Sequence, residues 1–134
     1  MPAHSFDYAV VRVVPRVERD EFINAGVILY CRGLDFLGAR IALDRARLTA
    51  LWPAAADDLD TIEAALSLVP RICDGDPTAG PIAALGPSER FHWLVSPRSA
   101  MTQVSPVHSG LCDDPAAMLD HLVDTVVRVD RRAR

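Results

Sequence analysis

The residues best suited to chemistry in this sequence are two arginines and an asparagine near its start. Arg12, Asn24 and Arg40 lie in three segments that are typical of neighbouring strands, and the alternation of side chains places all three on one side of a sheet. Guanidinium groups bind carboxylates and phosphates through paired hydrogen bonds. Gly26 would leave room for such a ligand, so the pattern predicts a site for an anionic small molecule.

Two residues from the later part of the chain belong to the same hypothesis. Arg98 lies in a serine-rich segment near Arg90, and His108 is the last residue of a predicted fourth strand. Both side chains can donate hydrogen bonds to an anion. The predicted ligand-binding set therefore consists of Arg12, Asn24, Gly26, Arg40, Arg98 and His108.

The same polar residues have two other interpretations. Cross-strand ion pairs are common on solvated sheet faces, and here Arg12 has Glu21 or Asp7 nearby while Arg40 has Asp35. A third interpretation is that a second copy of the chain or a partner protein covers this face, because large apolar side chains share it with the polar ones. Those side chains are Tyr8, Ile28, Tyr30 and Phe36.

Other arrangements of reactive residues give weak signals. His92, His108 and Cys112 are near one another in sequence, but zinc ordinarily takes four ligands in recognisable pairs. A nucleophile scheme with Cys112 or Ser109, His108 and Asp113 lacks a nucleophile elbow. The acidic residues at 57, 58 and 60 suit the start of a helix. The sequence therefore predicts no catalytic residue, no metal and no cofactor.

Three strands joined by short turns must position the polar residues. They cover about residues 7–14, 22–31 and 35–43, with Pro15 ending the first and Gly33 expected at positive φ in the second turn. Odd-numbered residues are expected on an apolar face that helices cover: Ala9, Val11, Val13, Ile23, Ala25, Val27, Leu29, Leu37, Ala39, Ile41 and Leu43. Even-numbered residues from Tyr8 to Arg40 are expected on the opposite, partly polar face.

The rest of the chain alternates helices with one loop and one further strand. Asp44 and Pro53 bound a short helix, and a second helix extends to Cys73 with a possible kink at Pro70. Residues 74–87 are rich in glycine and proline and predict a loop. Ser88 begins a third helix, residues 101–108 form a fourth strand, and Asp113, Asp114 and Pro115 begin the last helix, which should cross the apolar face.

These elements predict one α+β domain over residues 1–134. An antiparallel sheet of about four strands begins with a three-stranded meander, and the helices pack on one face. The expected organisation is a meander (6–43), helices (44–73), a loop (74–87), a helix-strand-helix unit (88–130) and a basic tail (128–134).

Composition limits the classes of function. The chain has 134 residues, half of them hydrophobic, and a net charge of −4, which gives no general attraction to nucleic acid. Three cysteines without a CxxC spacing predict buried thiols. The apolar runs are too short to span a bilayer, so we expect a cytoplasmic protein without a membrane partner.

Several segments together resemble a bacterial family of domains of unknown function, numbered 3037. The most specific part is the pattern of Arg12, Pro15, Glu21, Asn24 and Gly26. The other matching segments are Tyr8–Pro15, Glu21–Leu29, Gly75–Pro77, Arg90–Ser99 and Ser105–Leu111. The resemblance supplies no catalytic residues. It implies an accessory or binding role and a HipA-like, kinase-related protein, encoded nearby, as a partner.

Two hypotheses of function follow. The favoured one is a non-enzymatic module that binds a partner protein, or forms a homo-oligomer such as a homodimer, through the polar sheet face and the loop after Cys73. The alternative is an enzyme or sensor that binds a phosphate- or carboxylate-bearing small molecule at the predicted anion site.

Overall fold

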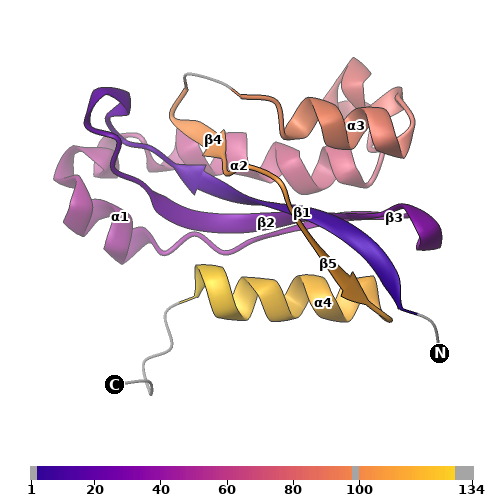
Figure 1. The fold of residues 1–134 in the computed structure, drawn as a ribbon. Helices are drawn as coiled ribbons and strands as arrows, with labels where there is room; N and C mark the ends of the chain where they lie inside the picture. The colour runs from indigo at the N-terminus through magenta and orange to yellow at the C-terminus, as the bar shows by residue number, and fades with distance from the viewer. Residues whose placement is uncertain (1–2, 98–99, 129–134) are drawn as a thin grey trace.

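A five-stranded antiparallel sheet forms the centre of the molecule (Figure 1). The computed structural model describes residues 3–97 and 100–128. The strands run in the order β3-β2-β1, and both β4 and β5 pair with the outer edge of β1. Their bounds are β1 His4–Val13, β2 Ile23–Cys31, β3 Phe36–Ile41, β4 Thr102–Val104 and β5 His108–Cys112. The predicted α+β class and the N-terminal meander are confirmed.

Four α-helices surround the sheet, and the last continues into a π-helical turn, η6. They are α1 Arg45–Leu51, α2 Leu59–Cys73, α3 Pro87–Leu94, α4 Pro115–Leu122 and η6 Val123–Val127. Asp44 and Asp114 cap α1 and α4 as predicted, each accepting a hydrogen bond from a backbone N–H three residues later. The cap of α3 is Gly86, not Ser88. The left-handed residue in the turn between β2 and β3 is Asp35, not Gly33.

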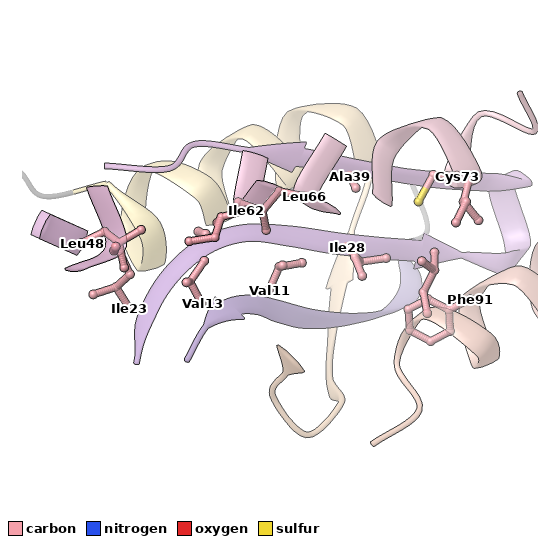
Figure 2. Packing of buried hydrophobic residues seen from close by; sticks show 14 residues of the cluster. Val11, Val13, Ile23, Ile28, Ala39, Leu48, Ile62, Leu66, Cys73 and Phe91 are labelled. Carbon is pink, nitrogen blue, oxygen red and sulfur yellow. The ribbon is translucent and has the colours of Figure 1, made fainter. Parts of the chain in front are cut away.

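The helices cover both faces of the sheet, whereas the sequence predicted one. Helices α2 and α3 lie on one side and α4 lies on the other (Figure 1). The buried apolar side chains accordingly form two separate clusters, one on each side of the sheet. The first includes Val11, Val13, Ile28 and Leu66, shown in Figure 2, and the second joins Val27 and Leu29 to residues of α4 and η6. The face expected to be open is therefore buried under the C-terminal helix.

A β-bulge in β2 explains why the predicted faces were partly wrong. Arg12 pairs with Asn24 and Val13 with Ile23, but Val11 pairs with Gly26, so Ala25 is an extra residue. One extra residue reverses which side each later side chain faces. From Gly26 to Tyr30, β2 therefore presents its even-numbered residues to α2 and α3. Strand β3 keeps the predicted orientation, with Ala39 opposite Ile28.

Of the predicted fourth strand, residues 101–108, only β4 forms, and a further strand, β5, begins at its last residue. Strands β4 and β5 are separated at Pro106, which has no N–H to donate to a ladder. The buried Ser105 joins the two parts to β1: its N–H donates to the carbonyl oxygen of Val10 at 2.8 Å, and its Oγ accepts from the N–H of Val10 at 2.8 Å. This side chain replaces a backbone acceptor at the break, so β1 stays paired there.

The bulge gives Gly26 a packing role that can be tested. A Cβ at Gly26 would lie 2.6 Å from both the backbone oxygen of Arg40 and Cδ1 of Ile41. We expect Gly26→Ala to lower the free energy of unfolding by about 1–3 kcal/mol, the usual cost of overpacking. Urea denaturation measures it. Gly86→Ala is the control, because a Cβ there would meet only Oε1 of Glu89 at 3.6 Å. Equal stability of both variants would contradict this account of the β2–β3 contact.

Candidate functional site

Arg12 and Asn24 lie side by side where β1 and β2 approach their shared turn. They are direct cross-strand partners. The guanidinium carbon of Arg12 lies 4.0 Å from the centroid of the Phe22 ring, a cation–π contact. Neither acidic residue suggested by the sequence binds Arg12, because Glu21 accepts from Arg19 at 2.6 Å and Asp7 accepts from Ser109 at 2.7 Å. Arg12 is thus held by an aromatic ring.

Asn24 ties the end of the C-terminal helix to the sheet. Its Nδ2 donates to the backbone oxygen of Val126 at 2.9 Å. That oxygen belongs to η6, the last turn, where the backbone carbonyls carry partial negative charge. This partial negative charge attracts the positive charge of Arg12 and would repel an anionic ligand. Nε of Arg12 and Oδ1 of Asn24 are buried without a partner among the described residues.

Arg40 contacts a different part of the same helix. Its Nε lies 3.2 Å from Oδ1 of Asp120 on α4, and its Nη1 donates to the backbone oxygen of Ala39 at 3.2 Å. Asp120 and Val126 are six residues apart, or about 9 Å along a helix. Arg40 therefore shares a sheet face with Arg12 and Asn24, as predicted, but the C-terminal helix holds it at a separate point. The predicted partner Asp35 is not used.

The remaining predicted residues lie elsewhere. Gly26 faces α2 and α3, on the opposite side of the sheet from Asn24, and its missing side chain makes room for β3. His108 is exposed at the start of β5, with its ring 5.3 Å from that of Tyr8. Arg98 lies outside the described residues. The anion-binding role of the six residues stays a prediction, now without a shared concavity to support it.

The histidines and cysteines do not form a reactive group within residues 3–97 and 100–128. His92 contacts the backbone oxygen of Ser88 within α3, while Cys112 is buried on the α4 side of the sheet. No group of three or more His, Cys, Asp or Glu side chains could hold a metal ion there. The three cysteines are free and buried, as predicted. Burial raises the pKa of Cys73 to about 12, and Asp74 adds to the shift. Such thiols are poor nucleophiles.

An apolar groove lies between α2, the end of α3 and β4. Its volume is about 190 Å³. The lining contains no ionisable side chain, and its buried floor is formed by Val11 and Ile28. Leu68 and Trp93 line the groove and are each 39% exposed. The other lining residues are Ala65, Val69, Ile72, Leu94, Ser96, Thr102, Gln103 and Val104. A concave apolar surface of this kind can receive one large apolar side chain.

Sequence reasoning missed this groove because only the fold brings its walls together. The spacing of apolar residues predicts an inward stripe on the second helix, formed by Leu59, Ile62, Leu66, Val69 and Cys73. Leu68 falls outside that stripe. An apolar residue on the outer side of an amphipathic helix is the sequence signal that could have indicated the groove. The sequence also predicts that Trp93 contributes to the apolar surface of the third helix. Neither assignment showed that β4 would lie opposite α2.

The side chains of two arginines connect the loop after Cys73 to helix α2 and to itself through hydrogen bonds. Nη1 of Arg90 donates to the backbone oxygens of Ile72 at 3.1 Å and Cys73 at 3.0 Å, at the end of α2. Nε of Arg71 donates to Asp76 at 3.0 Å, and Asp76 accepts from both the N–H and the Oγ1 of Thr78. These bonds satisfy the end of a helix and fix the first turn of the loop.

Comparison with known proteins identifies a family. A family model described as protein of unknown function (DUF3037) matches residues 8–127. This match covers most of the chain and confirms the predicted resemblance. No curated protein and no solved structure matches the chain.

A separate finding concerns the helices. Within the described part of the chain, none combines the length and apolar character needed to cross a lipid bilayer.

The bond from Asn24 to Val126 can be tested with two substitutions. Asn24→Ala leaves the partly buried carbonyl oxygen without its donor, and we expect a loss of roughly 1–2 kcal/mol in the free energy of unfolding. Asn24→Asp should cost more at pH 7, because its carboxylate faces the negative end of a helix. At pH 3 the protonated carboxyl of Asn24→Asp can donate a hydrogen bond to the Val126 oxygen. The free energies of unfolding of the two variants should then become equal or change order. Urea denaturation at both pH values measures this. An unchanged difference would contradict the helix tether.

The network around Asp76 predicts a dependence on pH. Hydrogen bonds from Thr78 and then Arg71 lower the pKa of Asp76 to about 2. Since the folded pKa lies below the unfolded value of about 3.9, the stabilisation is complete above pH 4 and is lost as the pH falls towards 2. Asp76→Asn should therefore be less stable than the wild type at pH 6, and the difference should shrink between pH 4 and 2.

The control for this experiment is Asp74→Asn. The Asp74 carboxylate accepts no hydrogen bond from the described residues. The stability of Asp74→Asn should therefore fall between pH 4 and 2 as the stability of the wild type does. Thermal melts across the pH series provide the measurement. An equal loss of stability between pH 4 and 2 in Asp76→Asn and Asp74→Asn would contradict a specific role for Asp76.

Proposed function

The chain belongs to the family described as protein of unknown function (DUF3037), and from its geometry we propose that it is a non-enzymatic binding module for a partner protein. The observation that carries the proposal is the groove between α2, α3 and β4. It combines a neutral lining with two large apolar side chains, Leu68 and Trp93, that are partly exposed to solvent. Exposed aromatic and aliphatic residues around a concavity are typical of anchor sites at interfaces.

The size and chemistry of the groove favour one kind of ligand. A volume of about 190 Å³ exceeds that of an engineered cavity of about 150 Å³ that binds benzene. It would hold an aromatic or branched side chain. The absence of ionisable lining residues disfavours a charged ligand, because a buried charge needs a partner. We therefore propose that the partner inserts an apolar side chain between Leu68 and Trp93.

The alternative function, binding of an anionic small molecule on the polar sheet face, has less support. Helix α4 and η6 cover that face, and the predicted residues already contact Phe22, Val126 and Asp120. The sequence predicted docking through the polar sheet face, whereas the groove proposed as the docking surface lies on the opposite side of the sheet. The buried thiols also give no support to an enzymatic reaction.

The test compares two leucines with the same exposed fraction. Leu68 lines the groove and Leu85 lies in the 74–87 segment, and each is 39% exposed. Binding of a partner should weaken at least tenfold in Leu68→Glu, because burying a leucine contributes about 1.5–3 kcal/mol. Leu85→Glu should bind like the wild type. The HipA-like protein expected from the family resemblance is the first partner to assay, by calorimetry with purified proteins.

Two results would argue against the proposed function. One is a partner that binds Leu68→Glu and Leu85→Glu equally well. The other is a homodimer, detected by light scattering, that is unaffected by Leu68→Glu. A dimer that dissociates in Leu68→Glu alone would keep the groove as the docking surface and identify the partner as a second copy.

A further inference from the structure

Strand β3 has an outer edge whose backbone groups are not bonded to another strand. Within the described residues β3 pairs only with β2. The N–H of Ala42 donates to Ala25 at 2.7 Å, and because bonding groups alternate along an antiparallel strand, the N–H and C=O of Leu37, Ala39 and Ile41 point away from β2. The contact from Nη1 of Arg40 to the oxygen of Ala39 agrees with this orientation. This edge can accept another strand.

A groove runs along this edge, with α2 as its second wall. Its volume is about 530 Å³, and the strand side is formed by Ala39, Arg40 and Ile41. On the helix side lie Leu66, Ser67 and Pro70. Pro70 has no N–H, so the carbonyl of Leu66, four residues earlier, lacks its usual donor within the helix. A strand edge beside a helix is the geometry in which extended peptides add to a sheet.

The edge of β3 has less protection than the opposite edge of the sheet. Proteins block exposed edges with prolines, bulges, charged residues or very short strands. On that side the chain is divided into β4 and β5 at Pro106. Strand β3 has six consecutive residues without proline, and its pairing with β2 shows no bulge. Its one charged residue, Arg40, lies across the edge.

The charges at the groove indicate the ligand. Glu63, also in the lining, is neutralised by Arg45, whose Nε donates to it at 3.0 Å. Arg40 is bound to Asp120 at 3.2 Å, with the two side chains 50% and 65% exposed. Arg40 uses Nε and Nη1 in its contacts with Asp120 and Ala39, and a guanidinium has five N–H donors, so Arg40 can bind a second carboxylate beside Asp120. The side-chain donors available to a ligand at the strand edge are therefore those of Arg40.

We propose that β3 and α2 bind an extended segment of a partner protein that carries an acidic residue. The segment adds to the sheet as a sixth strand, bonded to the outward groups of Leu37 and Ile41 and to the N–H of Ala39, whose oxygen already accepts from Arg40. Alternate side chains lie against α2 beside Ser67 and are small or apolar. The acidic side chain binds Arg40. This surface is on the other flank of α2 from Leu68, so it is independent of the proposed apolar groove.

The test uses random linear peptides displayed on phage and selected against the full chain. The expected peptides contain Asp or Glu beside alternating apolar residues. A synthetic copy should protect the amides of Leu37, Ala39 and Ile41 from hydrogen exchange. Ser67→Trp should fill the groove and weaken binding at least about tenfold. Ala64→Trp, exposed on the same helix but outside the groove lining, is the matched control and should bind normally.

Arg40→Gln tests the charge. Replacing the acidic residue of the peptide with its amide should weaken binding to the wild type but not to Arg40→Gln. Leu68→Glu should leave peptide binding unchanged, which separates this proposal from the apolar groove.

Three results would overturn the proposal. The first is a selection that yields no peptide with the alternating acidic pattern. The second is a selected peptide that binds Ser67→Trp as well as Ala64→Trp or protects amides outside β3. The third is a dimer of the wild-type chain that Ser67→Trp dissociates, because a second copy would then occupy the edge.

Discussion

Strand β2 is apolar on both of its faces, and the rest of the molecule is arranged to cover them. Val27 and Leu29 point to α4, and Ile28 points to α2 and α3; all three are fully buried. Burying each such side chain contributes about 1.5–3 kcal/mol. A strand of this kind requires a layer on each side, which is why α4 crosses the face that carries Arg12 and Asn24.

The bulge at Ala25 makes this double burial compatible with the polar residues near the turn. On one side of the bulge Asn24 faces η6 with Arg12, and on the other side Val27 faces α4. Without the extra residue, Asn24 and Val27 would lie on opposite sides of the sheet and could not both face the C-terminal helix. The polar residues therefore serve the end of the C-terminal helix, since Asn24 binds a carbonyl that the last turn leaves free.

Helix α2 connects the fold to the two proposed interactions. Its inner face contributes Ile62 and Leu66 to the core, while its flanks line two different grooves. One flank faces β4 through Leu68, and the other faces the edge of β3 through Ser67. The loop that follows is fixed by Arg90 and Asp76, so the end of α2 is held in place. Both proposed surfaces therefore lie on a helix whose end is fixed by hydrogen bonds, which suits a binding site.

The sequence by itself determined the elements and several of their ends. Period-two alternation identified the meander, Asp44 and Asp114 identified helix starts, and the spacing of Arg12, Asn24 and Arg40 placed them on one sheet face. These are local properties, because caps and alternation depend on residues close in the chain. The alternation rule failed only beyond the bulge, where the run from Val27 to Leu29 is apolar on both faces.

Only the tertiary structure decided which residues meet across the molecule. The bulge depends on how β2 packs between two layers, the break at Ser105 depends on a bond to Val10, and the grooves beside α2 depend on where β3 and β4 lie. The partners in these contacts are far apart in sequence, and their pairing follows from the packing of whole faces. Side-chain patterns within one segment carry no information about that choice.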